Sequence, residues 1–241
     1  MEKNHRIWAV VPAAASQAGP PGEKPKQYLP LAGKTVLETT LERLLQLDQI
    51  EGVVVAIAAS DIHWQKTSLV NHPRVYICLG AGERRDSVLN ALKLVDNYSE
   101  NNQQTWVLVH EALRPCVSLE KMEALISLCT LEGAGGILAV PHKESIKRVN
   151  SRGEIACSED ASKFWMARSP QLFNLNKLRA ALEFCKDKGY STIDEAAAIE
   201  KVGGRVKIVS DRRDNIRITS EDDLPLAEFI VQQQAELSEL E

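Results

Sequence analysis

No apolar run in this 241-residue sequence approaches the roughly 20 residues that a membrane-spanning helix needs, so we expect no membrane-embedded helix. Basic residues are not in excess either, because 29 Lys and Arg stand against 33 Asp and Glu and give a formal net charge of −4. A protein that binds nucleic acid through a global positive field has the opposite balance. We therefore expect no nucleic-acid partner, and any phosphate-binding site must be a local cluster of Lys and Arg.

The five cysteines are odd in number and have no metal-ligand spacing. Idle or buried thiols of this kind are typical of a reducing compartment, where disulfides do not persist. The first six residues are mostly polar and run straight into an apolar segment, which is unlike a signal peptide. These features together predict a cytoplasmic protein.

The sequence does contain a regular alternation of short β-branched runs and helical stretches. The runs that we predict to be strands are residues 7–14, 53–59, 75–79, 106–110, 136–140, 206–209 and 216–219. This alternation is typical of a Rossmann-like α/β fold, in which helices cover both faces of a mostly parallel sheet. The 44% hydrophobic content is sufficient for the core of one such domain.

Capping residues mark the expected helix starts. Thr35 and Glu38 have the form of a capping box, in which the threonine hydroxyl accepts a bond from the backbone N–H near Glu38. Further starts are expected at Asp86 or Ser87, at Ser118, at Asn176, within 192–195 and at Ser220, where a terminal helix runs to about residue 240.

The α/β alternation stops between residues 141 and 169. Residues 145–149 and 155–157 flank a Gly-containing turn at 150–153, which predicts a β-hairpin. An isolated two-stranded ribbon is marginal in water, so the hairpin must pack on something else, and a second copy of the chain is the simplest candidate. We therefore predict a single domain over 1–241 with 141–169 inserted as a β-arm that joins a homodimer.

The loop after the first strand is the first place to look for a site, because ligands bind at the carboxyl ends of parallel strands. Ala13 and Ala14 are small enough to let a flat base or ribose approach the backbone, and Lys26 can present a point charge to a phosphate. Small residues after a buried strand also serve helix–sheet packing, so this pattern by itself leaves both interpretations open.

Several segments, in order and with matching spacing over nearly the whole chain, resemble the 2-C-methyl-D-erythritol 4-phosphate cytidylyltransferase family. These segments are residues 12–14, 24–38, 83–88, 109–115, 135–141, 169–173, 194–196 and 214–219. The resemblance implies a nucleotidyltransferase of the non-mevalonate isoprenoid pathway. Such an enzyme transfers CMP from CTP to the phosphate of methylerythritol phosphate and releases pyrophosphate.

The resemblance also implies a role for particular residues, with Mg²⁺ as the cofactor. It places Lys26 and Arg217 in catalysis, Ala13, Ala14, Ala15, Gly82 and Ser87 against the nucleotide, Arg114 and Ser145 on the acceptor polyol phosphate, and Glu111 and Asp214 at the metal. The nucleophile is a phosphate oxygen that is already anionic at neutral pH, so the reaction depends on positioning and on charge neutralisation. His110, by contrast, is expected to be a structural hydrogen-bonding residue.

The chain departs from the family pattern at several of these positions. Glu111 replaces an Asp, Arg217 replaces a Lys, Ser145 replaces a Thr, and Ala161 stands where the family has an Arg that grips the acceptor phosphate. The first loop also lacks the glycines and the basic residue expected at 15–20. The side chains that could replace the missing charge are Lys24, Arg84, Arg85 and Arg168. Two alternatives therefore stay open: a noncatalytic homologue that acts as a dimeric binding protein, and a cytidylyltransferase for another polyol phosphate.

Overall fold

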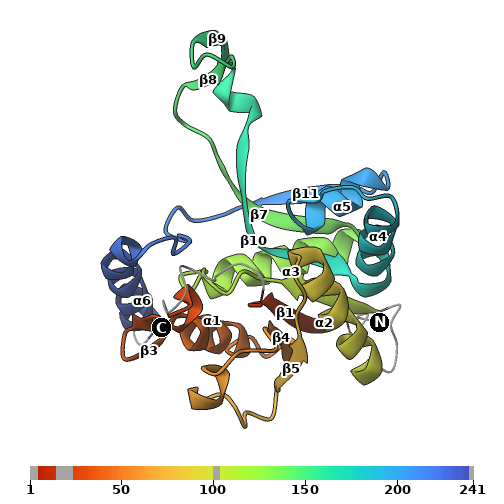
Figure 1. Ribbon diagram of the computed structural model, residues 1–241, viewed down its shortest axis with the longest axis vertical. Helices are drawn as coiled ribbons and strands as arrows, with labels where there is room; N and C mark the ends of the chain where they lie inside the picture. The colour runs from red at the N-terminus through yellow and green to blue at the C-terminus, as the bar shows by residue number, and fades with distance from the viewer. Residues whose placement is uncertain (1–4, 15–23, 100–103, 239–241) are drawn as a thin grey trace.

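The computed structural model describes residues 5–14, 24–99 and 104–238, and it contains one seven-stranded sheet (Figure 1). The strand order is β11-β7-β10-β6-β1-β4-β5. The strands are β1 (Arg6–Pro12), β4 (Ile50–Ile57), β5 (Val75–Leu79), β6 (Thr105–Val109), β7 (Gly135–Pro141), β10 (Trp165–Asn174) and β11 (Val206–Ser210). All neighbouring pairs are parallel except those of β10, which is antiparallel to both β6 and β7. The predicted α/β class with a mostly parallel sheet is confirmed.

Helices cover both faces of this sheet. They are α1 (Val36–Leu45), α2 (Arg84–Tyr98), α3 (Leu119–Glu132), α4 (Leu175–Asp187), α5 (Glu195–Lys201) and α6 (Leu224–Ser238). Along β1, Ile7 and Val11 face the core that contains α1 and α3, whereas Trp8 and Val10 face the core that contains α2, α4 and α5. Because both faces are covered, β1 is a continuous apolar run rather than an alternating one. None of the helices in the described part of the chain is long and apolar enough to cross a membrane.

Local sequence signals fix several of these boundaries. The capping box at Thr35 and Glu38 is present, and the Ser118 side chain accepts a hydrogen bond from the backbone N–H of Lys121. The prediction for α4 was wrong, because its cap is Asn174, whose side chain accepts from the N–H of Lys177. A cap is the last residue with extended backbone, and here it is the final residue of β10, two positions before the predicted Asn176.

Two further predictions were wrong. Helix α2 begins at Arg84, not at Asp86 or Ser87, so Asp86 lies within the first turn, where a carboxylate favours the helix dipole. Residues 216–219 are not a strand. Ile218 is fully buried against the α6 region and its N–H donates to the Leu113 carbonyl, so its apolar character reflects burial rather than sheet pairing. At Ser220 the predicted cap is present, and it opens a 3₁₀ turn that leads into α6.

The predicted hairpin consists of β8 (Ile146–Val149) and β9 (Ile155–Glu159), and it projects from the body of the molecule (Figure 1). Its turn is held by Asn150, whose side-chain oxygen accepts from the N–H groups of Arg152 and Glu154. Gly153 supplies the positive φ of +78° that this turn requires. The hairpin is therefore part of the fold, whereas its role in dimerisation stays a prediction. The remaining short pieces are β2 (Pro30–Leu31), β3 (Lys34–Thr35) and the 3₁₀ turns Lys26–Tyr28, Trp64–Lys66, Ala161–Lys163 and Glu221–Asp223.

Candidate functional site

A cavity of about 240 Å³ lies at the carboxyl end of β6, beside the middle of β10. Its lining carries four guanidinium groups and two carboxylates. The residues are Arg84, Glu111, Arg114, Ala167, Arg168, Ser169, Gln171, Ile193, Asp194 and Arg217. Four positive charges face two negative ones in the lining, and two further carboxylates lie behind it, Glu195 against Arg84 and Asp211 against Arg168, so a concentration of guanidinium groups at the cavity surface rather than a net charge suits an anionic ligand. The position agrees with the rule that ligands bind where parallel strands end.

Glu111 and Arg114 lie on the turn that follows β6. The Arg114 Nε donates to Glu111 Oε2 at 2.7 Å, and the Arg217 Nε lies 3.8 Å from the same oxygen. Burial by itself raises the pKa of Glu111, but the charges of Arg114 and Arg217 outweigh it and hold the pKa below its ordinary value. Glu111 is therefore ionised at neutral pH. Its other oxygen, Oε1, accepts no hydrogen bond from the described residues.

His110 is a buried residue whose side chain supports this turn through hydrogen bonds. The Arg114 carbonyl can only accept a hydrogen bond, so His110 Nε2, which lies 3.0 Å from it, carries the ring hydrogen and donates. The other nitrogen, Nδ1, is then an acceptor, and it accepts from the Ser169 hydroxyl at 3.1 Å. The same Ser169 Oγ accepts a hydrogen bond from the Glu111 N–H. Burial lowers the pKa of His110 from 6.5 to about 4, which keeps the ring neutral. With both nitrogens engaged, His110 positions the turn, as the sequence predicted.

This neutral histidine predicts a pH dependence of stability. The unfolded chain takes up a proton on His110 below pH 6.5, whereas the folded chain does so only near pH 4. The contribution of His110 to the free energy of unfolding is thus fully present above pH 6.5. It is lost as the pH falls toward 4, and the total loss is about 3 kcal/mol. Urea unfolding at pH 7 and pH 4 should show a distinctly smaller pH-dependent loss for His110→Gln than for the wild type. Equal losses in the two proteins would contradict this assignment.

The segment from Asp211 to Thr219 contributes Arg217 to the cavity wall. The Arg168 guanidinium donates to the carbonyls of Arg212, Arg213 and Asn215, and Arg114 also donates to the Asn215 carbonyl. Burial and then the nearby charge of Arg114 lower the pKa of Arg168, so the arginines repel one another. An anion bound in the cavity would relieve this repulsion.

Ile193 and Asp194, which directly precede α5, also line the cavity. Asp194 caps the helix through Oδ1 at 2.8 Å from the Ala197 N–H, and its Oδ2 accepts from Gln171. The Arg84 guanidinium pairs with the buried Glu195 at 2.9 Å. Arg84 and Arg168 were foreseen only as possible replacements for a missing charge, and Gln171 and Asp194 were not predicted as lining residues. The sequence did indicate that Gln171 and Asp194 could matter, because both lie in segments that resemble the cytidylyltransferase family, 169–173 and 194–196.

The residues predicted to bind the nucleotide gather at a second place. A Cβ added to Gly80 would lie 2.1 Å from the Ala14 Cβ and 3.1 Å from the Ser87 Oγ, so Ala14 and Ser87 both lie against this glycine. Ala13 is buried and its carbonyl accepts from Gln27, while a Cβ added to Gly82 would meet open space. Ala15 and the rest of the altered first loop lie outside the described residues.

The other predicted residues are more widely placed. Glu111, Arg114 and Arg217 line the cavity together, whereas Lys26 and Asp214 do not line it. The Lys26 ammonium donates to the Thr219 carbonyl, and the Asp214 carboxylate is paired with Arg212 at 2.6 Å. Both therefore contact or belong to the wall segment 211–219. Ser145 is exposed, directly precedes β8 of the projecting hairpin and is not among the residues that line the cavity.

Comparison with known proteins identifies the family. The model of the IspD family, described as 2-C-methyl-D-erythritol 4-phosphate cytidylyltransferase, matches residues 7–233. The chain belongs to the 2-C-methyl-D-erythritol 4-phosphate cytidylyltransferase family. The cytidylyltransferase of that name from Tolumonas auensis is 42% identical over 226 residues, which are 94% of this chain and 96% of the relative. The corresponding Pseudomonas putida protein is 41% identical over 90% of this chain and 92% of the relative.

Solved structures of the family share the fold. The crystal structure of the Francisella tularensis 2-C-methyl-D-erythritol 4-phosphate cytidylyltransferase matches with a TM-score of 0.80 at 33% identity, over 93% of this chain and 99% of that one. The Thermus thermophilus structure of the same name matches with a TM-score of 0.76 at 22% identity, over 94% of this chain and 99% of that one, which supports the fold alone.

Glu111 and Asp214 remain the candidate carboxylates for a metal ion that is bound together with a nucleotide. Within residues 5–14, 24–99 and 104–238 no group of three or more His, Cys, Asp or Glu side chains is placed to hold a metal. Mg²⁺ in nucleotide enzymes, however, uses one or two carboxylates together with substrate phosphates. In this cytidylyltransferase, Glu111 has one oxygen that is not hydrogen-bonded, and Asp214 would have to exchange its contact with Arg212.

Proposed function

We propose that the chain transfers CMP from CTP to the phosphate of 2-C-methyl-D-erythritol 4-phosphate and releases pyrophosphate. The observation that carries the proposal is the cavity of four arginines at the carboxyl end of β6, in a chain that belongs to this family. An oxygen of the acceptor phosphate attacks the α-phosphorus of CTP. The bond from that phosphorus to the oxygen bridging to the β-phosphate breaks, and pyrophosphate leaves with the electron pair.

The cavity supports an acceptor phosphate as the ligand. Arg114 and Arg217 approach the same carboxylate oxygen, so their guanidinium groups face one small volume. Arginine forks match the geometry of phosphate oxygens and stay charged at all working pH values. Arg168 adds a third guanidinium to the lining, from the part of β10 where the arm returns to the sheet. We propose that it replaces part of the charge that the family carries at the position of Ala161.

The attacking oxygen needs no base. A phosphate is anionic at neutral pH, and the histidine nearest the turn, His110, is neutral, buried and bonded at both ring nitrogens. The described residues of the cavity therefore bind and orient the acceptor and stabilise the negative charge that redistributes in the transition state.

The nucleotide is proposed to bind beside the cavity. Ala14 and Ser87 pack against Gly80, where a larger residue would collide with Ala14, and the small side chains of Ala14 and Ser87 leave room for a flat base to approach this strand end. Ala13 and Gly82 flank this place, and Lys26 is the candidate for the triphosphate. For that contact the Lys26 ammonium must exchange the Thr219 carbonyl for a phosphate oxygen. Mg²⁺, held by Glu111 and Asp214 with the phosphates, would neutralise part of the triphosphate charge.

We also propose that the 1–241 domain forms a homodimer through the arm at 141–169. The support is the hairpin that projects from the body (Figure 1), together with the exposed apolar side chains of Phe164, Trp165 and Met166, of which the last two pair with the end of β7. In such a dimer Ser145 would meet the acceptor site of the partner subunit. Light scattering during gel filtration should give twice the chain mass, and a monomer would contradict the proposal. The cytoplasm, where free thiols persist, is the proposed location.

Pyrophosphate release tests the proposed reaction. The purified chain should release pyrophosphate only when CTP, Mg²⁺ and 2-C-methyl-D-erythritol 4-phosphate are all present, and each omission should abolish the signal. Replacement of the acceptor by other polyol phosphates tests the acceptor identity. A folded chain that stays inactive with all three components would favour the noncatalytic alternative, and faster turnover of another polyol phosphate would favour the second.

A further inference from the structure

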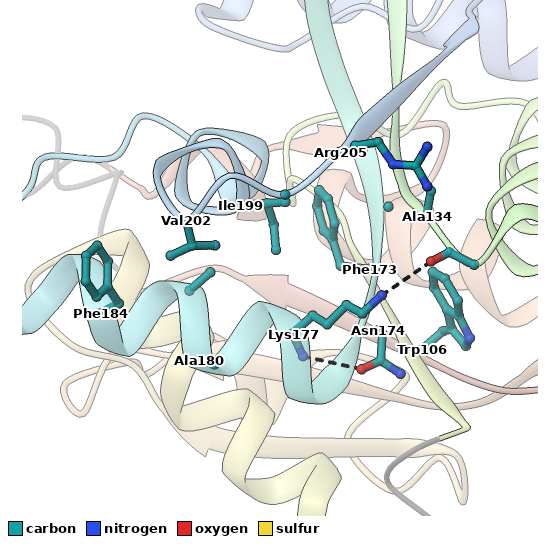
Figure 2. Close-up of a pocket in the computed structure, with 14 residues that line it drawn as sticks. Trp106, Ala134, Phe173, Asn174, Lys177, Ala180, Phe184, Ile199, Val202 and Arg205 are labelled. Atoms are coloured by element: carbon teal, nitrogen blue, oxygen red, sulfur yellow. Dashed lines mark hydrogen bonds between the residues drawn. The ribbon is translucent and has the colours of Figure 1, made fainter.

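A second cavity, separate from the candidate site, lies between α4, α5 and the sheet (Figure 2). Its volume is about 520 Å³, within the usual range for small-molecule sites and more than three times the roughly 150 Å³ that holds one benzene. The two cavities share no lining residue. Any ligand of the second cavity would therefore be different from the substrates of the candidate site.

The inner surface of this cavity is apolar. Trp106, Phe173 and Ile199 are almost fully buried in the core and form part of its wall, whereas Phe184 and Val202 are partly exposed at the solvent side. Burial of apolar surface against such a wall is favourable at about 25 cal/mol per Å². An apolar group of the size of two or three aromatic rings would gain most from this shape.

The charged side chains are gathered at one end. Lys177 and Arg205 lie toward the end where Ala134 and Trp106 lie, and Phe184 and Val202 lie toward the other (Figure 2). No acidic side chain is among the described residues that line the cavity. The only hydrogen bond of the Lys177 ammonium to described residues is a long one of 3.4 Å to the Gly133 carbonyl. Both cations can therefore serve an incoming anion.

From this polarity we infer that the cavity binds an amphipathic anion, with its apolar body between α4 and α5 and its carboxylate or phosphate head between Lys177 and Arg205. A neutral or cationic apolar molecule would leave the two positive charges without a partner. A purely ionic ligand would leave the apolar wall in water. Only the combined chemistry satisfies both ends of the cavity.

Binding of decanoate, decyl phosphate and decyltrimethylammonium, each below its micelle concentration, tests the inference by isothermal titration calorimetry. The two anions should bind at one site per chain, and the cation with the same tail should bind at least about tenfold more weakly. A tighter site for decyl phosphate than for decanoate would identify a phosphate-bearing ligand, and the reverse order a carboxylic acid. Equal affinity for the cation and the anions would overturn the inference.

Three variants locate the bound ligand. Ala180→Trp fills the cavity from an exposed position of α4 and should abolish binding of both anions without changing the melting temperature. Removal of both charges in Lys177→Gln/Arg205→Gln should weaken anion binding by about tenfold, as expected for the loss of two partly exposed charge contacts. Lys188→Gln removes a charge from the end of α4 outside the cavity and should bind like the wild type. Unchanged binding by the first two variants would place the anion elsewhere and contradict the inference.

Discussion

An Arg217→Met variant is expected to lose about 10²- to 10³-fold in kcat/KM for the acceptor, the usual cost of removing one charged donor from a phosphoryl-type transition state. The fold should not suffer, because the Arg217 side chain is 45% exposed and its ion pair with Glu111 is long at 3.8 Å. Exposed pairs of this kind stabilise by at most about 1 kcal/mol. Steady-state kinetics of pyrophosphate release, together with the melting temperature, measure both quantities.

Two matched variants make this prediction specific. Arg217→Lys keeps the charge, and the family resemblance places a lysine here, so it should retain activity within about tenfold of the wild type. Arg213→Met removes an exposed charge from the same segment but not from the cavity lining, and it should leave kcat/KM unchanged. Similar losses in Arg213→Met and Arg217→Met would show that the effect comes from the net charge of the segment, against the proposed role.

The largest effect on stability is expected from Arg84→Met. The variant leaves the carboxylate of Glu195, whose side chain is 2% exposed, without its partner. Removal of one partner from a fully buried ion pair lowers the free energy of unfolding by roughly 3–5 kcal/mol. Because the Arg84 side chain is 32% exposed, we expect a loss of about 2–3 kcal/mol here. The free energy of unfolding in urea measures this loss.

A double variant separates the effect of leaving the Glu195 carboxylate unpaired from the other effects of removing Arg84. Arg84→Met/Glu195→Gln should be more stable than Arg84→Met by about 1–2 kcal/mol, because no unpaired buried carboxylate remains. Arg179→Met breaks a pair with Asp96 in which both side chains are about 30% exposed, and it should cost no more than about 1 kcal/mol. A double variant as unstable as the single one would mean that Arg84 contributes through packing alone.

Sequence patterns predicted most of the fold because they record local chemistry. The β-branched runs of β1, β4 and β5 and the capping box at Thr35 depend on neighbours within a few residues, and they were found close to their true positions. Strand β10 was missed because it leaves the arm and enters the sheet antiparallel between two parallel strands. That order depends on long-range pairing. For the same reason the buried Ile218 was mistaken for part of a strand.

The site was predictable to the same extent. Resemblance to the family pointed to Glu111, Arg114 and Arg217, which the structure brings together in one cavity. It could not show that Arg168 turns inward, because that depends on three carbonyls more than 40 residues away in the chain. Nor could it show that His110 is buried and bonded to Ser169, since that contact forms only when β10 lies beside β6.

Recognition of the acceptor phosphate by the four-arginine cavity is the central claim, and calorimetry tests it most directly. The chain would be titrated in the presence of Mg²⁺ and α,β-methylene-CTP, which blocks transfer, with 2-C-methyl-D-erythritol 4-phosphate and with the same polyol lacking its phosphate. The phosphorylated compound should bind at least about 100-fold more tightly, and Arg217→Met should remove most of that difference. Equal affinities for the two compounds, or an Arg217→Met variant that keeps the full difference, would contradict the claim.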